Sequence, residues 1–175
     1  MSDSMKQIRI EKLTLNFGSG TDQKKLEKGI KLIKAITGIT PVKTVTSKRI
    51  PTWGLRPGLA IGCKLTLRGE KASELLEKFI AAKEKQLSLR NFDGNGNISF
   101  GIHEYVDIPG VKYDPELGII GLEISVTLAR PGFRIKLRKI KKRKISHSQR
   151  INRVEAVNFF KERFSITIKE EQDDL

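Results

Sequence analysis

The sequence predicts an α+β fold in which helices cover one face of a β-sheet and leave its other face open. Three segments alternate aliphatic residues with Thr, Ser, Asn, Lys or Arg, as strands buried on one face do. Other segments carry apolar residues at helical spacing, which predicts amphipathic helices. Only the apolar stripes of these helices can cover the aliphatic face of the sheet. With 175 residues, of which 38% are hydrophobic, the chain is long enough for a single domain, placed at 1–168.

The first half of the chain is predicted as strand, helix, strand and strand. Residues 8–17 form the first strand, and Asp22 or Thr21 caps a helix that Gly38 ends. Residues 40–48 and 59–69 form the next two strands. The third strand alternates through Cys63, which predicts a buried thiol rather than a nucleophile or a disulfide partner.

The second half continues with a helix over residues 70–86 and a strand pair or irregular extended segment over 98–108. A clearly alternating strand follows at 118–129, and a further strand at 133–138 is expected to run into a basic arm spanning 130–150. The last helix begins after Asn152, whose capping partner is Glu155. Its predicted buried residues are Val154, Val157, Phe160 and Phe164. Residues 165–168 are a candidate closing strand, and 169–175 a disordered acidic tail.

Charge is concentrated in two blocks. The net charge is +14, with nine cations and no acid from Lys28 to Gly69, and ten cations and no acid from Arg130 to Arg150. A single run of this kind is usually a solvated surface. Two long acid-free blocks favour a partner that is a polyanion, because neutralised phosphates release condensed counterions.

Other classes of function have little support. The two histidines are far apart, no Cys/His set has zinc spacing, and no apolar run reaches a membrane span of roughly 18 residues. The chain is therefore expected to be cytoplasmic, without a metal or cofactor. The turn Gly18–Gly20 lacks the Gly-Lys-Ser/Thr ending of a phosphate loop, so a nucleotide-dependent enzyme is a weaker alternative. A generic nucleic-acid-binding protein or RNA chaperone is another alternative.

The segment 47–58, "SKRIPTWGLRPG", is too long for a tight hairpin turn of about two to five residues. It contains the only tryptophan, three basic side chains and no acid. It is predicted to protrude from the sheet as a second binding element. The alternative is a proline-stiffened surface loop in which Trp53 folds back on the core.

Five segments in succession point to a family: "NFGSG", "ITGITPVKTVTSK", "RPGLAIGCKLTLRGEKASELLEKFI", "NFDGNGNISFGIHEYVDIPGVKYD" and "GLEISVTL". Between Ile8 and Leu128 they resemble the motifs of the large-subunit ribosomal protein L-five family. Residues 143–168 resemble its archaeal and eukaryotic branch, and the archaeal form in particular. The sequence departs from that branch in the lysine-rich run 139–144 and in the acidic tail.

The resemblance implies a mainly antiparallel sheet similar to an RNA-recognition domain, and a structural role in the ribosome without enzymatic activity. The implied partners are 5S rRNA in the central protuberance, large-subunit rRNA, neighbouring ribosomal proteins, peptidyl-site tRNA and a protein of the small-subunit head. The implied 5S rRNA contacts on the open face are Lys12, Thr14, Asn16, Lys43, Thr46, Lys64, Thr66 and Arg68. The implied contacts of the loop with tRNA and the small subunit are Lys48, Arg49, Pro51, Thr52, Trp53, Gly54 and Arg56. Further rRNA contacts are expected on the arm at Arg134, Lys136, Arg138, Lys141, Lys142, Arg143, Lys144 and His147.

Overall fold

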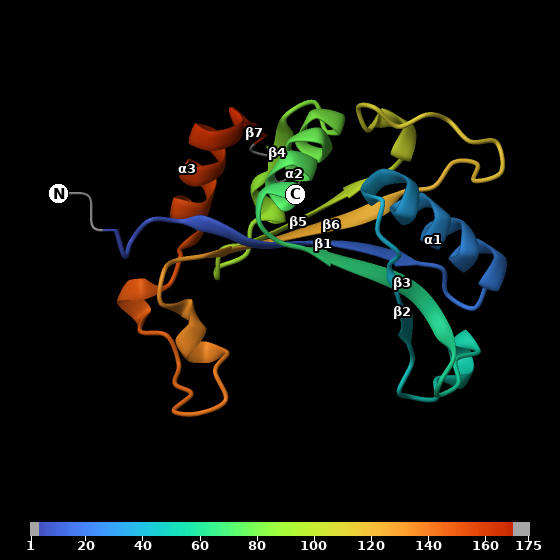
Figure 1. Ribbon diagram of the computed structural model, residues 1–175, viewed down its shortest axis with the longest axis horizontal. Coiled ribbons are helices and arrows are strands. Elements are labelled where there is room, and N and C mark those ends of the chain that lie inside the picture. Colours follow the sequence, from blue (N-terminus) through green and yellow to red (C-terminus); the bar gives the residue numbers. More distant parts are fainter. Residues whose placement is uncertain (1–3, 170–175) are drawn as a thin grey trace, which may run out of the picture.

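A five-stranded sheet forms the centre of the computed structural model, which describes residues 4–169 (Figure 1). The strand order is β2-β3-β1-β6-β5, and each neighbouring pair is antiparallel. The strands are β1 (Arg9–Gly18), β2 (Val42–Val45), β3 (Ala60–Leu67), β5 (Asn97–Ile102) and β6 (Leu122–Ala129). A separate small sheet pairs β4 (Gln86–Ser88) with β7 (Thr167–Lys169) in parallel. The predicted α+β class and the antiparallel sheet are confirmed.

Three helices lie on the same side of the sheet: α1 (Gln23–Thr37), α2 (Glu70–Ala82) and α3 (Arg153–Phe164) (Figure 1). Helix α1 begins as predicted, because Asp22 Oδ1 accepts hydrogen bonds from the N–H groups of Lys24 at 2.9 Å and Lys25 at 3.2 Å. It ends at Gly38, whose φ of +73° is the left-handed conformation expected at a helix C-terminus. The opposite face of the sheet carries no α-helix of the described chain.

The core lies between the sheet and the helices. Leu13, Leu15 and Cys63 are fully buried in it. The burial of Cys63 confirms the prediction of a buried thiol, and this burial raises the pKa of the thiol to about 11. Gly29 permits close contact between α1 and β1, because a Cβ at that position would collide with the ring of Phe17.

Helix α3 adds an aromatic cluster to this core. The rings of Phe92 and Phe160 pack edge to face with centroids 6.0 Å apart, and Phe164 lies 5.1 Å from Phe160. The predicted cap is present, since the N–H of Asn152 donates to Glu155 Oε2 at 2.9 Å. Val154, predicted to be buried, is instead 69% exposed because it lies on the outer side of the helix.

Two boundaries differ from the prediction near residue 86. Helix α2 ends at Ala82 because Glu84 and Lys85 adopt left-handed φ angles of 53° and 59°. The N–H of Lys85 then donates to Ile80 O at 3.0 Å, which closes the helix without a glycine. The chain continues as β4, a strand that the sequence did not predict. Further on, the segment 98–108 contains one strand, β5, followed by a 3₁₀ turn at Tyr105–Asp107.

The predicted strand at 133–138 is wrong. After Gly132, with φ of +89°, the chain forms a 3₁₀ helix at Phe133–Lys136 and the ring of Phe133 is buried. The alternation of basic and apolar residues in this segment therefore belongs to a 3₁₀ turn rather than to a strand. At the C-terminal end, Lys169 belongs to β7 rather than to the predicted tail, and residues 170–175 lie outside the described residues.

Candidate nucleic-acid interface

Six of the eight residues predicted to contact 5S rRNA lie together on the open face of the sheet. The register explains why: directly opposite residues point to the same face, and Leu13, Leu15 and Leu65 point toward the helices. Thr14 lies between Thr66 and Ser125, and Asn16 lies between Lys64 and Glu123. The six residues are Lys12, Thr14, Asn16, Lys64, Thr66 and, one residue beyond β3, Arg68.

The polar surface extends further across the sheet than the predicted site. Asn97, Ser99, Ser125 and Thr127 continue the same rows on β5 and β6, since Ser99 pairs with Ser125 and Asn97 with Thr127. The hydroxyls of Ser99 and Ser125 lie 3.2 Å apart. The same period-two alternation signals these positions in the sequence. Together with the predicted residues on β1 and β3, these residues form a flat surface of hydroxyl, amide and cationic groups. Such groups can contact phosphates and ribose hydroxyls.

One acid interrupts this surface. Glu123 lies beside Asn16, and the amide Nδ2 of Asn16 donates to its Oε2 at 2.9 Å. The carboxylate lies on the β6 side of β1, whereas the exposed cations Lys64 and Arg68 lie on the β3 side. The positive charge of the open face is therefore concentrated toward β3.

Lys43 and Thr46 do not share the open face in the way that the prediction required. Lys43 pairs with Cys63, so its side chain points to the helix-covered side of the sheet at the edge strand β2. The hydroxyl of Thr46 donates to Arg56 O, and its backbone N–H donates to Leu59 O at 2.9 Å. Thr46 therefore closes the base of the loop 47–58 and is not a free donor.

The loop 47–58 projects from the sheet on the side opposite the helices (Figure 1). A bridge between Ile50 and Leu55 and a 3₁₀ turn at Pro51–Trp53 give it a defined shape. Trp53 is 68% exposed, so the alternative in which it folds back on the core is wrong. All seven predicted contact residues of the loop are exposed: Lys48, Arg49, Pro51, Thr52, Trp53, Gly54 and Arg56.

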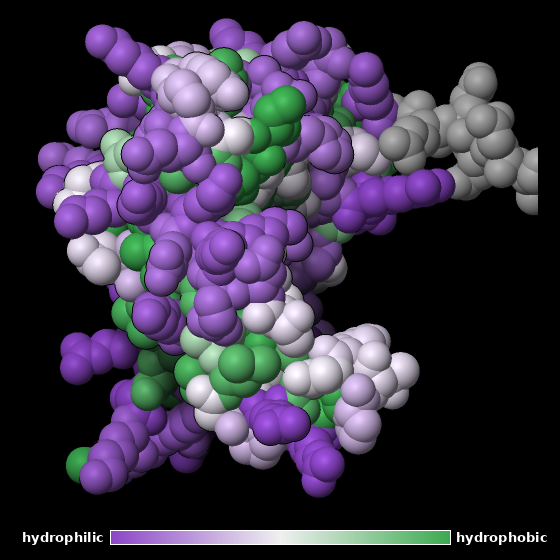
Figure 2. Space-filling model, turned by 90° about the vertical axis from the view of Figure 1, so that its right-hand side faces the viewer, coloured by the Kyte–Doolittle hydropathy of each residue, from purple (hydrophilic) through white to green (hydrophobic). Residues whose placement is uncertain are grey.

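The lower half of the view in Figure 2 shows apolar surface among the hydrophilic side chains, on the side where β2 and this loop lie. Val42 and Val45 of β2 contribute to the exposed apolar surface of the molecule, at 65% and 61% exposure. The register places Val42 opposite Lys64, on the open face. The margin of the face beside the loop is therefore less polar than its centre.

The basic arm 130–150 projects on the same side as the loop, at the other end of the sheet (Figure 1). Arg130, only 5% exposed, holds its two ends together: Nη2 contacts Glu155 Oε1 at 2.7 Å and Nη1 donates to Arg150 O at 3.3 Å. Burial opposes ionisation of Glu155, but hydrogen bonds from Asn152 and Arg130 and the arginine charge outweigh it and lower the pKa. The arm is thus attached through an ion pair whose arginine is buried.

Seven of the eight predicted arm contacts are exposed, and these are Arg134, Arg138, Lys141, Lys142, Arg143, Lys144 and His147. Lys136 is different, because it is partly buried. Its Nζ lies 3.9 Å from Glu11 Oε2 and 5.0 Å from the centroid of the Phe133 ring. Lys136 therefore helps to hold the arm against β1.

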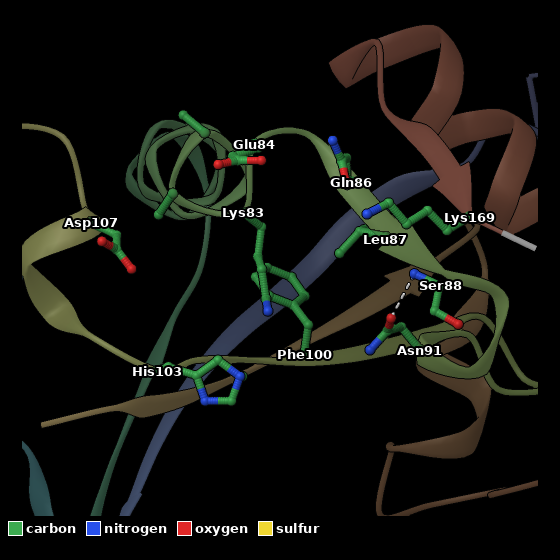
Figure 3. A pocket seen from close by; sticks show the side chains of 13 residues that line it. Lys83, Glu84, Gln86, Leu87, Ser88, Asn91, Phe100, His103, Asp107 and Lys169 are labelled. Atoms are coloured by element: carbon green, nitrogen blue, oxygen red, sulfur yellow. Dashed lines mark hydrogen bonds between the residues drawn. The ribbon is translucent and has the colours of Figure 1, made fainter. Parts of the chain in front are cut away.

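A cavity lies away from the predicted binding surfaces, between the end of α2, β4 and β5 (Figure 3). It has a volume of about 750 Å³, and Lys83, His103 and Lys169 surround it with Glu84 and Asp107. The two acids balance the two lysines, so its charge does not favour a polyanion. Among residues 4–169, no group of three or more His, Cys, Asp or Glu side chains is arranged to hold a metal ion.

The turn at Gly18–Gly20 does not offer a phosphate-binding loop. The N–H groups of Ser19 and Gly20 both donate to Ile61 O, at 2.9 and 3.2 Å. Nucleotide loops need such groups free to face a phosphate. Within the described part of the chain, no helix is long and apolar enough to cross a membrane.

Comparisons with known proteins agree with the resemblance seen in the motifs. A family model described as "Ribosomal protein L5" matches residues 3–56, and a second model, which describes the C-terminus of the same ribosomal protein family, matches residues 60–169. The boundary between them falls in the loop region, and both parts contribute strands to the same sheet.

Individual relatives match over almost the whole chain, and all three described here carry the name "Large ribosomal subunit protein uL5". The protein from Nanoarchaeum equitans is 47% identical over 96% of this chain and 99% of its own length. That from Sulfurisphaera tokodaii is 44% identical over 95% and 94%. That from Methanosphaera stadtmanae is 41% identical over 94% and 98%.

Proposed function

Because the chain belongs to the uL5 family of large-subunit ribosomal proteins, a structural and non-enzymatic family, we propose that its open sheet face binds 5S rRNA in the central protuberance. The observation that supports this most is that six donor residues lie in adjacent rows on a face that no α-helix of residues 4–169 covers. The loop and the arm lie at the two ends of that face and on its open side (Figure 1). A folded RNA seated on the face would therefore lie between two cationic flanks.

The binding works through charge and shape. Lys12, Lys64 and Arg68 neutralise phosphates, and released counterions supply affinity that does not depend on base sequence. The hydroxyls of Thr14 and Thr66 reach only groups that lie directly on the sheet, such as phosphate oxygens and ribose hydroxyls. Since the sheet fixes these positions, preference for 5S rRNA arises from the fit of a particular folded surface.

A binding experiment tests this proposal directly. The full chain is titrated with 5S rRNA and with an unrelated folded RNA of equal length over a salt series. We expect tighter binding of 5S rRNA at each salt concentration. Equal affinity for both RNAs would reject the specific interaction and favour the generic RNA-binding or chaperone alternative.

The triple variant Lys64→Ala, Thr66→Ala and Arg68→Ala tests the surface. It should lose the preference for 5S rRNA and reduce the slope of log affinity against log salt by about 2, roughly one for each phosphate contact. The matched control is Lys71→Ala with Lys78→Ala, which removes the same charge from exposed positions on α2. If the control weakens binding as much as the triple variant, the open face is not the site.

We also propose that the loop 47–58 contacts peptidyl-site tRNA and the head of the small subunit. The support is its exposure: three cations and Trp53 project from the sheet without a neighbouring acid in the loop. Arginine and lysine suit a tRNA backbone, and an exposed indole offers a stacking surface. Pro51 and Pro57 limit the conformational entropy that the loop loses on contact.

Deletion of Arg49 to Leu55 separates the two functions. The shortened protein should bind 5S rRNA as the full chain does, while ribosomes assembled with it should translate more slowly. Loss of 5S rRNA binding in the deletion variant would show instead that the loop is part of the first site.

A further inference from the structure

A small cationic cavity lies at the root of the arm, where the arm meets the turn that precedes β5. Its volume is about 310 Å³, near the lower end of the range of about 300–1,000 Å³ for small-molecule sites. Its apolar lining consists of Phe133, Ile145 and Ile151. Its polar lining consists of Lys136, Lys144, Arg150 and Asn95. The sequence pattern did not reveal it, because its residues come from both ends of the arm and from a separate turn.

The apolar side of the cavity is held in place. Ile151 is 1% exposed and Phe133 is 8% exposed. Ile151 also packs against Gly96, where a Cβ would lie 2.9 Å from the Cβ of Ile151. The bond from Arg130 to Arg150 O keeps the two ends of the arm together. The cavity therefore exists without a ligand to shape it.

The charge of the cavity has one sign. Among residues 4–169, three cations line it and no acid does. Glu11 lies 3.9 Å from Lys136 Nζ and offsets that lysine, and Asp93 lies on the same turn as Asn95. Lys144 and Arg150 are therefore the cations that can attract an anion. An anion with a flat apolar part complements this combination of cationic and apolar lining.

Asn95 supplies a group that can recognise an edge of a base. Its backbone N–H donates to Asp93 Oδ1 at 2.8 Å, so the turn fixes the position of the residue. Its side chain is exposed, and its amide makes no hydrogen bond within residues 4–169. A side-chain amide has both donor and acceptor groups, as the edge of a nucleobase requires.

We propose that this cavity binds one unpaired nucleotide of an RNA. The base lies against the half-buried Ile145, the phosphate contacts Lys144 and Arg150, and the Asn95 amide pairs with the edge of the base. The proposal rests on the proposed function in one respect, namely that RNA is the partner. It differs from the phosphate contacts expected along the arm, because it requires a base.

The test measures the affinity of the full chain for single-stranded RNA tetranucleotides, with and without one abasic residue, by NMR titration of the isoleucine methyl groups. We expect saturable shifts at Ile145 and Ile151, and at least about fivefold tighter binding of the intact RNA, which corresponds to about 1 kcal/mol for one base. Equal affinity of the intact and abasic RNAs would overturn the proposal. A nucleoside monophosphate that binds as tightly as the tetranucleotide would assign the cavity to a free nucleotide and overturn the RNA assignment.

Two variants locate the effect. Asn95→Trp, at an exposed position on the rim, should abolish the difference between intact and abasic RNA. Lys144→Ala should weaken binding of both RNAs, and the control Lys71→Ala, which removes one exposed lysine from α2, should weaken neither. Persistence of the base effect in Asn95→Trp would place the base elsewhere. Failure of the 5S rRNA preference, measured separately, leaves this base effect intact, so the two proposals can fail independently.

Discussion

The loop 47–58 and the arm 130–150 are both cationic and free of acidic residues, but they are attached to the sheet in different ways. Backbone hydrogen bonds at Thr46 close the loop, and its tryptophan is exposed. The arm instead inserts Phe133 and Arg130 into the protein, where both are nearly buried. Charge pattern alone therefore identifies a protrusion but does not show how it is held. The exposed residues of the loop can therefore bind a partner, whereas several residues of the arm also stabilise the fold.

The largest difference should appear when the aromatic residue of each protrusion is removed. Phe133→Ala should reduce the free energy of unfolding by about 3 kcal/mol, the lower end for a buried phenylalanine, because it leaves a cavity at the root of the arm. Trp53→Ala should change it by less than about 0.5 kcal/mol, since the indole is mostly in solvent. Urea denaturation measures both. A costly Trp53→Ala together with a harmless Phe133→Ala would reverse the comparison.

A smaller effect is expected from Arg130→Met, which removes the cationic partner of Glu155 and leaves the hydrogen bond from the N–H of Asn152. Breaking a fully buried ion pair costs about 3–5 kcal/mol, and the loss here should be about 2–3 kcal/mol because Glu155 is 40% exposed. The exposed Arg134→Met serves as the control. The measurement is again urea denaturation, and equal stability of the two variants would show that the ion pair does not anchor the arm.

The smallest effect concerns pH and tests the same anchor. The lowered pKa of Glu155 means that ionised Glu155 stabilises the folded chain at pH values above its unfolded pKa near 4.5, and that this contribution is lost as pH falls through the folded pKa. The variant Glu155→Gln should cost about 1 kcal/mol at pH 7, a figure reduced for partial exposure. Unfolding at a series of pH values should show this difference shrinking below pH 4.5. A difference independent of pH would contradict the assignment.

Much of the fold and of the open face follows from alternation in the sequence. In β1, the apolar residues Leu13 and Leu15 alternate with the polar residues Thr14 and Asn16. This alternation is enough to assign the two faces of the strand, because a strand has a period of two. The cap at Asp22 and the end of α1 depend only on local chemistry. These predictions succeed because neighbouring residues determine them.

The remaining features depend on contacts between distant residues. Lys43 lies on the helix side because the register between β2 and β3 places it opposite Cys63. The register shifts after Thr44, and the alternation of a strand as short as β2 does not reveal this shift. Phe133 turns inward because Gly132 redirects the chain toward the core. The contacts of Arg130 join residues 20 and 25 positions away. No local pattern encodes these contacts.

Lysine footprinting of the chain bound to 5S rRNA tests the central proposal most directly. Acetylation rates are compared with and without the RNA, and modified residues are identified by mass spectrometry. We expect protection of Lys12 and Lys64 on the open face, and unchanged reactivity of Lys48 in the loop and of Lys71 on α2. Protection of Lys71 with full reactivity of Lys64 would contradict the assignment of 5S rRNA to the open face.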